Sequence, residues 1–213
     1  MIPADRTVFW DVDTQYDFMM SDGKLYVPGS EEIIPVLGAL TDHAHDHGIR
    51  ILASADDHVP GHRELSEEPD FLTTFPEHCM RGTPGQEKIA ATTLRNPLVI
   101  DPTPREDPGF PDTVRIHDGD ILFLKYWFDV FTNPNVLPAL DALDLQRVVL
   151  YGVATDVCDR YAMEGLLRHR PGLTLYFVCD AARGIDADAS DRLRREWKAQ
   201  GVRMVTAQEV LTR

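Results

Sequence analysis

The chain has little cysteine, little positive charge and no long apolar run. The chain has three cysteines in 213 residues, a small and odd number that does not fit a disulfide framework. Lys and Arg number 21 against 35 Asp and Glu, and the net charge of −14 argues against binding to nucleic acid or to an anionic membrane. No run approaches the roughly 20 apolar residues of a membrane-spanning helix. The first residues also lack a signal-peptide pattern, so we expect a cytoplasmic protein.

What is present is the pattern of one α/β domain spanning residues 1–213. Short Val/Ile/Leu-rich runs alternate with longer amphipathic segments, and hydrophobic residues make up 43% of the chain. The strand candidates are 7–12, 49–55, 98–101, 120–125, 147–153, 173–179 and 202–206, and the main helix candidates are 31–47, 136–143, 156–168 and 188–200. This alternation predicts a three-layer α/β/α fold with a mostly parallel, Rossmann-like sheet of about six strands. The proline-rich stretch 95–119 is interpreted as an irregular excursion within that domain.

Reactive side chains follow several of the predicted strands. Asp13 comes after the first strand, Asp56 and His58 after the second, Lys125 ends a third, and Cys158 opens the helix after the strand RVVLYGV. Because the carboxyl ends of parallel strands meet at one edge of a sheet, and ligands bind there, we expect these residues to form an active site.

Cys158 is the candidate nucleophile. An isolated cysteine is more often a buried packing residue, which is our interpretation of Cys179. A thiol in the first turn of a helix, however, lies near the positive end of the helix dipole, which favours the thiolate. Asp13 could serve as its base if burial raises the pKa of that carboxyl group, and Lys125 could hold Asp13 charged. Each of these signals is weak alone, since a lysine after a strand is more often a surface residue.

A metal site is the second chemical feature of the sequence. Alternate residues of an extended segment face the same way, so Asp56 and His58 could reach one ion, and His78 is the best candidate for a third ligand. Carboxylate and imidazole ligands suit zinc, iron or manganese. For any single D-x-H the commoner alternative is a solvated histidine near an aspartate.

Taken together, these motifs resemble the nicotinamidase/pyrazinamidase branch of the isochorismatase-like cysteine hydrolases. The resemblance runs in order from about residue 7 to 205. The matching segments are VDTQYDF at 12–18, DDHVPGH at 56–62, HC at 78–79 with GTPGQE at 82–87, LK at 124–125, GVATDVC at 152–158 and DAARG at 180–184.

The resemblance implies a role for each catalytic residue. Cys158 would be the nucleophile, Asp13 the proton acceptor and later donor, and Lys125 their electrostatic partner. A cis peptide bond between Val153 and Ala154 would aim the backbone N–H groups of Ala154 and Cys158 at the oxyanion of the intermediate. The implied reaction is hydrolysis of nicotinamide, or of a related heteroaromatic carboxamide, through a thioester.

The resemblance also implies a cofactor and an assembly. Asp56, His58 and His78 would hold a divalent metal, zinc first and iron or manganese as alternatives, which in this branch takes the ring nitrogen of the substrate. His62 lies where some relatives have a further ligand, and we place it beside the ligands. A homo-oligomer, a dimer or a tetramer, that acts on a small-molecule amide is expected.

The sequence departs from the family pattern around the expected substrate pocket. Asp57 stands where an aromatic residue is usual, Phe75 where many relatives have tryptophan, and an aromatic stretch at 126–133 replaces small residues. The pocket candidates are Phe18, Asp57, His62, Phe75, Trp127, Phe131 and Val153. These departures leave two alternatives open: a cysteine hydrolase acting on another small amide or carbamoyl compound, and a non-enzymatic, metal-dependent binding module. An isochorismatase acting on a vinyl ether is disfavoured, because that branch lacks the metal residues.

Overall fold

A computed structural model describes residues 2–212. The strands are β1 (Thr7–Val12), β2 (Arg50–Asp56), β3 (Leu98–Ile100), β4 (Ile121–Lys125), β5 (Arg147–Val153), β6 (Thr174–Arg183) and β7 (Arg203–Val205). The α-helices are α1 (Tyr16–Met19), α2 (Ser30–Asp46), α3 (Phe110–Ile116), α4 (Val136–Ala142), α5 (Cys158–His169), α6 (Ala187–Ala199) and α7 (Ala207–Leu211). Three short 3-10 helices complete the elements: η1 (Pro84–Gln86), η2 (Ala90–Thr92) and η3 (Val130–Thr132).

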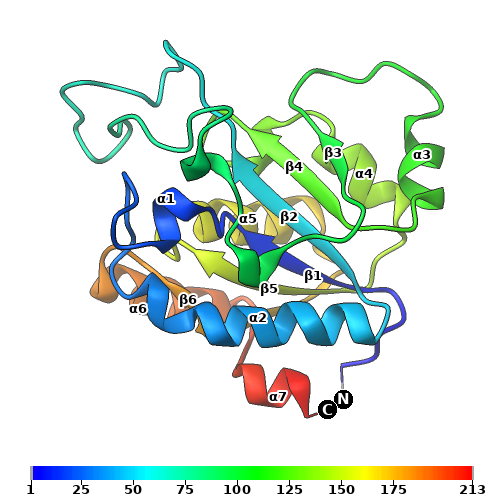
Figure 1. Cartoon of the computed structure of the whole chain (residues 1–213). Helices are drawn as coiled ribbons and strands as arrows, with labels where there is room; N and C mark the ends of the chain where they lie inside the picture. The colour runs from blue at the N-terminus through cyan, green and yellow to red at the C-terminus, as the bar shows by residue number, and fades with distance from the viewer. Residues whose placement is uncertain (1, 213) are drawn as a thin grey trace.

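The strands form one sheet of seven in the order β3-β4-β2-β1-β5-β6-β7, and every neighbouring pair is parallel (Figure 1). The predicted three-layer α/β/α fold is confirmed, but the sheet has seven strands instead of about six. The difference arises at the edges, where the three-residue strands β3 and β7 both pair with a neighbour. Helix α3 was not predicted, because it lies in the proline-rich stretch and begins with a proline in its first turn.

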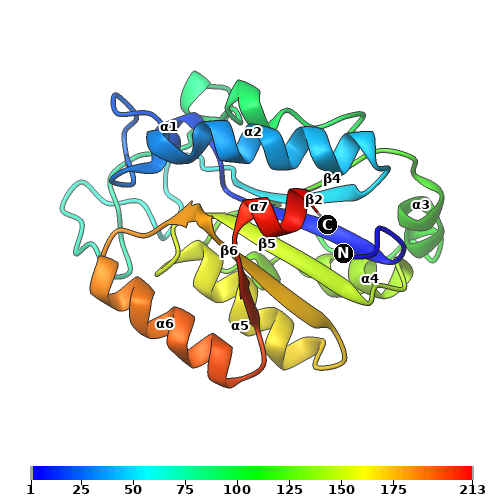
Figure 2. The same ribbon diagram turned by 90° about the horizontal axis from the view of Figure 1, so that it is seen from below.

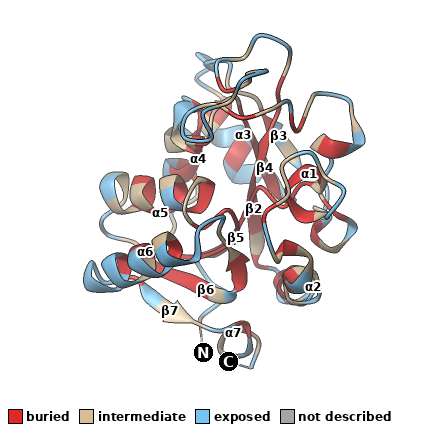
Figure 3. Cartoon of the chain, turned by 90° about the vertical axis from the view of Figure 1, so that its left-hand side faces the viewer, coloured by how far each residue is buried: buried red, intermediate tan, exposed pale blue. Residues whose placement is uncertain are grey.

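Alternate residues of the strands build two core layers, one on each face of the sheet. In β1, Phe9 belongs to the core cluster that includes residues of α2 and α7, whereas Trp10 belongs to the cluster on the opposite face that includes residues of α5 and α6. Figure 2 shows α2 and α7 on one side of the sheet and α5 and α6 on the other. Each fully buried side chain of this kind contributes roughly 1.5–3 kcal/mol. The outer faces of the helices are exposed, as Figure 3 shows. Within residues 2–212 no helix combines the length and hydropathy needed to cross a bilayer.

The strand order places the functional residues. The chain builds β2, β4 and β3 on one side of β1 and then crosses to β5 on the other side, so the order reverses between β1 and β5. Crevices at such reversals bind ligands at the carboxyl ends of the strands. Asp56 ends β2 and Lys125 ends β4, whereas Asp13 directly follows β1 and Ala154 directly follows β5.

Candidate active site

Lys125 lies at the centre of a group of buried charges. Its Nζ is 2.9 Å from Asp13 Oδ2, forms an ion pair with Asp56, and lies 3.7 Å from Cys158 Sγ. The pairing with Asp56 follows from the sheet register, because Asp56 and Lys125 are partners at the ends of β2 and β4. The sequence therefore correctly predicted that these strand ends bring Asp13, Lys125 and Cys158 together.

The end of β1 is tied to the end of β2 by short contacts. The Asp13 N–H donates to Ser54 O over 3.2 Å, and the Gln15 side chain exchanges two hydrogen bonds of 2.8 and 2.7 Å with the backbone of Asp56. Asp13 has φ of 49°, a left-handed conformation that is uncommon for a residue with a side chain and that occurs often at functional sites. These contacts hold the backbone of Asp13 beside the end of β2.

Burial and charge determine the protonation states of the three groups. Burial raises the pKa of Asp13, and Lys125 only partly opposes this rise. Burial by itself lowers the pKa of Lys125, but Asp13 and Asp56 outweigh it and raise the pKa well above its ordinary value, so the lysine stays charged. Burial also raises the pKa of the Cys158 thiol. The expectation of a lowered thiol pKa at a helix start was therefore wrong, and this thiol needs a nearby base. A carboxylate oxygen of Asp13 lies within 4.8 Å of Cys158 Sγ.

The turn from β5 into α5 brings Cys158 to the edge of the sheet. The peptide bond between Val153 and Ala154 is cis, as the resemblance implied. Gly152 has φ of 135°, and a Cβ there would lie 2.1 Å from the Val12 carbonyl oxygen. A side chain at this position is therefore excluded by the close approach of β1 and β5.

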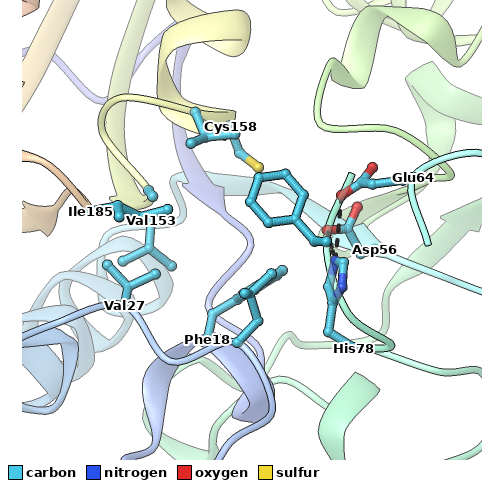
Figure 4. Close-up of a pocket in the computed structure, with 12 residues that line it drawn as sticks. Phe18, Val27, Asp56, Glu64, His78, Val153, Cys158 and Ile185 are labelled. Carbon is cyan, nitrogen blue, oxygen red and sulfur yellow. Dashed lines mark ion pairs between the residues drawn. The ribbon is translucent and has the colours of Figure 1, made fainter. Parts of the chain in front are cut away.

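Four ligating side chains gather beside the ion pair. One donor atom each from Asp56, His58, Glu64 and His78 lies within 4.8 Å of the others, and all four residues are buried. Within residues 2–212, Asp56 Oδ2, Glu64 Oε2 and the Nε2 atoms of both histidines have no hydrogen-bond partner, and His78 Nε2 makes only ion-pair contacts of 3.4 Å with Glu64 and 3.7 Å with Asp56 (Figure 4). Buried polar atoms without partners are costly, and a mixed carboxylate and imidazole set suits a divalent transition metal. His78 Nδ1 lies 2.8 Å from the Pro76 carbonyl oxygen, which leaves Nε2 facing the group.

The sequence pointed to three of these four residues and missed Glu64. Glu64 lies in an irregular loop, and its position depends on pairing with a distant segment: the Phe75 N–H donates to Glu64 O over 2.7 Å. An acidic residue shortly after the D-x-H motif was the only available signal. His62 lies outside the group of four, with its ring 4.5 Å from that of Tyr126 and its Nδ1 3.3 Å from His58 Nδ1.

A pocket opens between Cys158 and three of the four ligating residues, Asp56, Glu64 and His78. It is lined by Phe18, Leu25, Val27, Asp56, Glu64, Phe75, His78, Val153, Ala154, Val157, Cys158 and Ile185. Phe18, Phe75 and Val153 lie in this wall, where the sequence predicted them. Figure 4 shows Val27, Val153 and Ile185 on one side and Asp56, Glu64 and His78 on the other. The pocket thus has one apolar side and one ligating side.

Four other pocket candidates, Asp57, His62, Trp127 and Phe131, do not line this pocket. Asp57 points instead to Arg81 and Gln86, whose Nε and Nε2 atoms donate to its Oδ1 over 2.8 and 2.6 Å. The carboxylate that stands where relatives have an aromatic residue therefore joins the D-x-H loop to the segment that follows His78.

The two aromatic candidates of the 126–133 stretch pack against other elements. The Arg63 guanidinium lies 3.8 Å from the centre of the Trp127 ring. Phe131 packs 6.2 Å from the Trp10 ring and 5.5 Å from that of His169. The Trp127 ring faces a charged side chain, and the Phe131 ring packs against the core, so both lie away from the pocket.

Comparison with known proteins places this geometry in a family. The model of the isochorismatase domain matches residues 8–209. The nicotinamidase/pyrazinamidase of Mycobacterium tuberculosis is 26% identical over 197 residues, which are 91% of this chain and 95% of that protein. The crystal structure of the pyrazinamidase of Pyrococcus horikoshii in complex with zinc is 26% identical, with a TM-score of 0.73 over 94% of this chain and 99% of that one. The crystal structure of PnC1 from L. infantum in complex with nicotinate shares the fold at 19% identity, with a TM-score of 0.73 over 98% of this chain and 96% of that one.

The resemblance that the motifs indicated is thereby confirmed. The family model covers nearly all of the described residues, and both relatives at 26% identity carry nicotinamidase or pyrazinamidase names. The chain belongs to the isochorismatase family and is similar to its nicotinamidase/pyrazinamidase branch of amide hydrolases.

Proposed function

We propose that this protein is a metal-containing cysteine amidohydrolase that converts nicotinamide, or a related heteroaromatic carboxamide, to the acid and ammonia. The observation that carries the proposal is Lys125, which contacts Asp13 and Cys158 while pairing with one member of a buried ligating group. A nucleophile, a base and a fixed positive charge thus meet at one end of a pocket that has a ligating side.

The reaction follows from the protonation states. Asp13 accepts the proton of the Cys158 thiol as the sulfur attacks the carboxamide carbon, which overcomes the raised thiol pKa. The backbone N–H groups of Ala154 and Cys158 donate to the oxyanion of the tetrahedral species. Asp13 then gives its proton to the leaving ammonia, and a thioester remains on Cys158. Water deprotonated by Asp13 releases the acid, and Lys125 keeps its charge throughout.

The four ligating residues fit a divalent metal. Asp56, His58, Glu64 and His78 would hold it, and zinc is the first choice because the Pyrococcus relative is in complex with zinc. When bound, the metal supplies a Lewis-acid site for the ring nitrogen, which orients the substrate. The apolar side of the pocket then faces the ring, and Phe18 and Phe75 exclude water from it.

The alternative of a different amide substrate depended on Asp57 and on the 126–133 stretch. Asp57, Trp127 and Phe131 do not line the pocket, so this reason for preferring another substrate is lost. A binding module without activity is also disfavoured, because it would not need a lysine buried between an acid and a thiol.

Ammonia release from nicotinamide tests the proposal. We expect release by the wild-type protein, a loss of at least about 1,000-fold in Cys158→Ala, and little change in Cys179→Ala, which removes a half-buried thiol from β6. Treatment with a chelator should abolish release, and zinc should restore it. Equal release by Cys158→Ala and the wild type would refute the proposal. The homo-oligomer stays a prediction for light scattering to check.

A further inference from the structure

The corner between β6 and α6 contributes one side chain to the pocket. Ile185 lies in this corner, is 48% exposed and lines the pocket. The other large exposed hydrophobic side chains of residues 2–212 are Phe71, Leu72, Val99 and Ile116, and none of them lines it. Figure 4 shows Ile185 beside Val153 and Val27, across the pocket from Asp56 and His78. Its position is therefore at the edge of the pocket that is remote from the ligating group.

Asp156 holds this corner in place. Its Oδ1 accepts from the Ile185 N–H and its Oδ2 from the Asp186 N–H, each over 2.8 Å. The Thr155 N–H donates to Arg183 O over 2.8 Å. The turn that leads to Cys158 therefore contacts the backbone both before Gly184, at Arg183, and after it, at Ile185 and Asp186. Asp156 lies two residues before Cys158. The same short segment therefore carries the candidate nucleophile and binds the backbone of the corner.

Close packing limits the freedom of the corner further. A Cβ on Gly184 would lie 2.0 Å from Ser190 Oγ and 2.8 Å from Asp156 Oδ1. Asp186 caps α6, because its side chain accepts from the Ala189 N–H over 2.9 Å. A side chain on the glycine of the DAARG motif, which the catalytic role leaves unexplained, would therefore crowd Ser190 and Asp156. The backbone that carries Ile185 is consequently held in place beside the pocket.

We propose that Ile185 is a specificity-determining residue of the amide pocket and that Asp156 is the residue that positions it. The inference rests on the proposed function and narrows its substrate class. With the ring nitrogen on the ligating side and the carboxamide at Cys158, the remaining ring edge faces Ile185, which offers no hydrogen bond. The pocket therefore selects small heteroaromatic carboxamides whose free edge is unsubstituted or bears a small apolar group, and it rejects larger or polar substituents. One methylene in such a pocket changes kcat/KM by about 10–200-fold.

Ile185→Ala tests the wall directly. The probes are nicotinamide and nicotinamides that carry a methyl, ethyl or propyl group on a ring carbon. We expect the wild type to lose kcat/KM as the group grows. Relative to nicotinamide, Ile185→Ala should regain at least about 10-fold in kcat/KM for the larger groups, through KM. Ile116→Ala is the matched control, because Ile116 is 80% exposed on α3 and outside the pocket.

The outcomes separate this inference from the function on which it rests. If the wild type hydrolyses nicotinamide but Ile185→Ala keeps the wild-type ratios of kcat/KM among these substrates, the role of Ile185 is refuted and the amidase stands. If no variant and no wild-type sample releases ammonia from any of these amides, the proposed function itself fails.

The positioning role of Asp156 has its own test. Asn offers one carbonyl acceptor where Asp offers two, so Asp156→Asn loses one of the two backbone contacts with the corner. We expect it to shift the ratio of propyl-substituted to unsubstituted kcat/KM in the same direction as Ile185→Ala. Because Asp156 acts through Ile185, the double variant should show no further shift in that ratio. Independent, additive shifts would show that Asp156 acts by another route and would overturn its assignment.

Discussion

Replacing Lys125 with methionine removes one positive charge from the centre of the site at nearly constant length. The Nζ atom is 2.9 Å from Asp13 Oδ2 and also pairs with Asp56, and the exposed fractions of these three side chains are at most 1%. Loss of one partner from a buried pair costs about 3–5 kcal/mol, because the remaining charge stays desolvated. For metal-free protein at about pH 8 we therefore expect the free energy of unfolding to fall by about 3–5 kcal/mol. In the metal-loaded protein we expect ammonia release to be lost.

The stability loss should depend on pH with a definite sign. Burial already raises the folded-state pKa of Asp13 above its usual 3.8, and Lys125 is the main group that opposes this rise. Without Lys125 the folded-state pKa rises further, so the folded variant binds more protons than the unfolded chain. Its stability then falls as pH increases through that pKa and is regained as the carboxyl group takes up a proton. The difference from wild type should narrow between about pH 8 and about pH 5.

Urea denaturation followed by tryptophan fluorescence measures both quantities. The matched control is Lys88→Met, because Lys88 Nζ lies 2.9 Å from Asp11 Oδ2 and its side chain is only 10% exposed, yet it is outside the pocket. This control should lose stability but retain ammonia release. If Lys125→Met unfolds at the same urea concentration as the wild type at both pH values, the charge balance inferred for the site is refuted.

Three further predictions concern metal binding and proton transfer. Glu64→Gln should lower the zinc affinity of the metal-free protein, measured by calorimetry, at least about 10-fold. Glu67→Gln, at an exposed position of the same loop, should leave that affinity unchanged. Equal zinc affinities of Glu64→Gln and the wild type would remove Glu64 from the ligand set. Asp57→Asn and Arg81→Gln should each weaken zinc binding, because the contact between these two side chains joins the two segments that carry ligands. The double variant should bind zinc as tightly as either single variant, and additive losses of affinity would contradict this coupling. The value of kcat/KM should decline as pH falls through the raised pKa of Asp13, since only the unprotonated carboxylate accepts the thiol proton, and a flat profile from about pH 7 to about pH 4 would contradict that role.

The positions of the proposed catalytic residues were predictable from sequence because regular structure places them. Asp13, Lys125 and Cys158 each follow or end a strand that the apolar pattern makes recognisable, and parallel strands deliver their carboxyl ends to one edge. Their mutual distances then depend on strand order and register, which bring Asp56 beside Lys125. The protonation of Cys158 was not predictable in the same way, because the pattern reveals the helix start but not the burial that outweighs its dipole.

The pocket and the fourth ligating residue were harder to predict because loops place them. An aromatic residue after a strand can face a pocket or the core, and the direction depends on a partner far away in the chain. Trp127 faces Arg63 and Phe131 faces Trp10, contacts that no local periodicity indicates. Glu64 likewise reaches the ligating group only because its loop pairs with Phe75.

The charges of the site link catalysis to metal binding. Three carboxylates, those of Asp13, Asp56 and Glu64, meet one ammonium group, that of Lys125, in a buried region. With both histidines neutral, as they are when they ligate a metal, and the other groups ionised, the negative charges exceed the positive by two, which is costly away from water. A divalent cation among the ligating residues would cancel this excess and let Asp13 remain the unprotonated base that the buried thiol requires. The carboxylate of Glu64, which the sequence did not single out, therefore bears on proton transfer as well as on metal affinity.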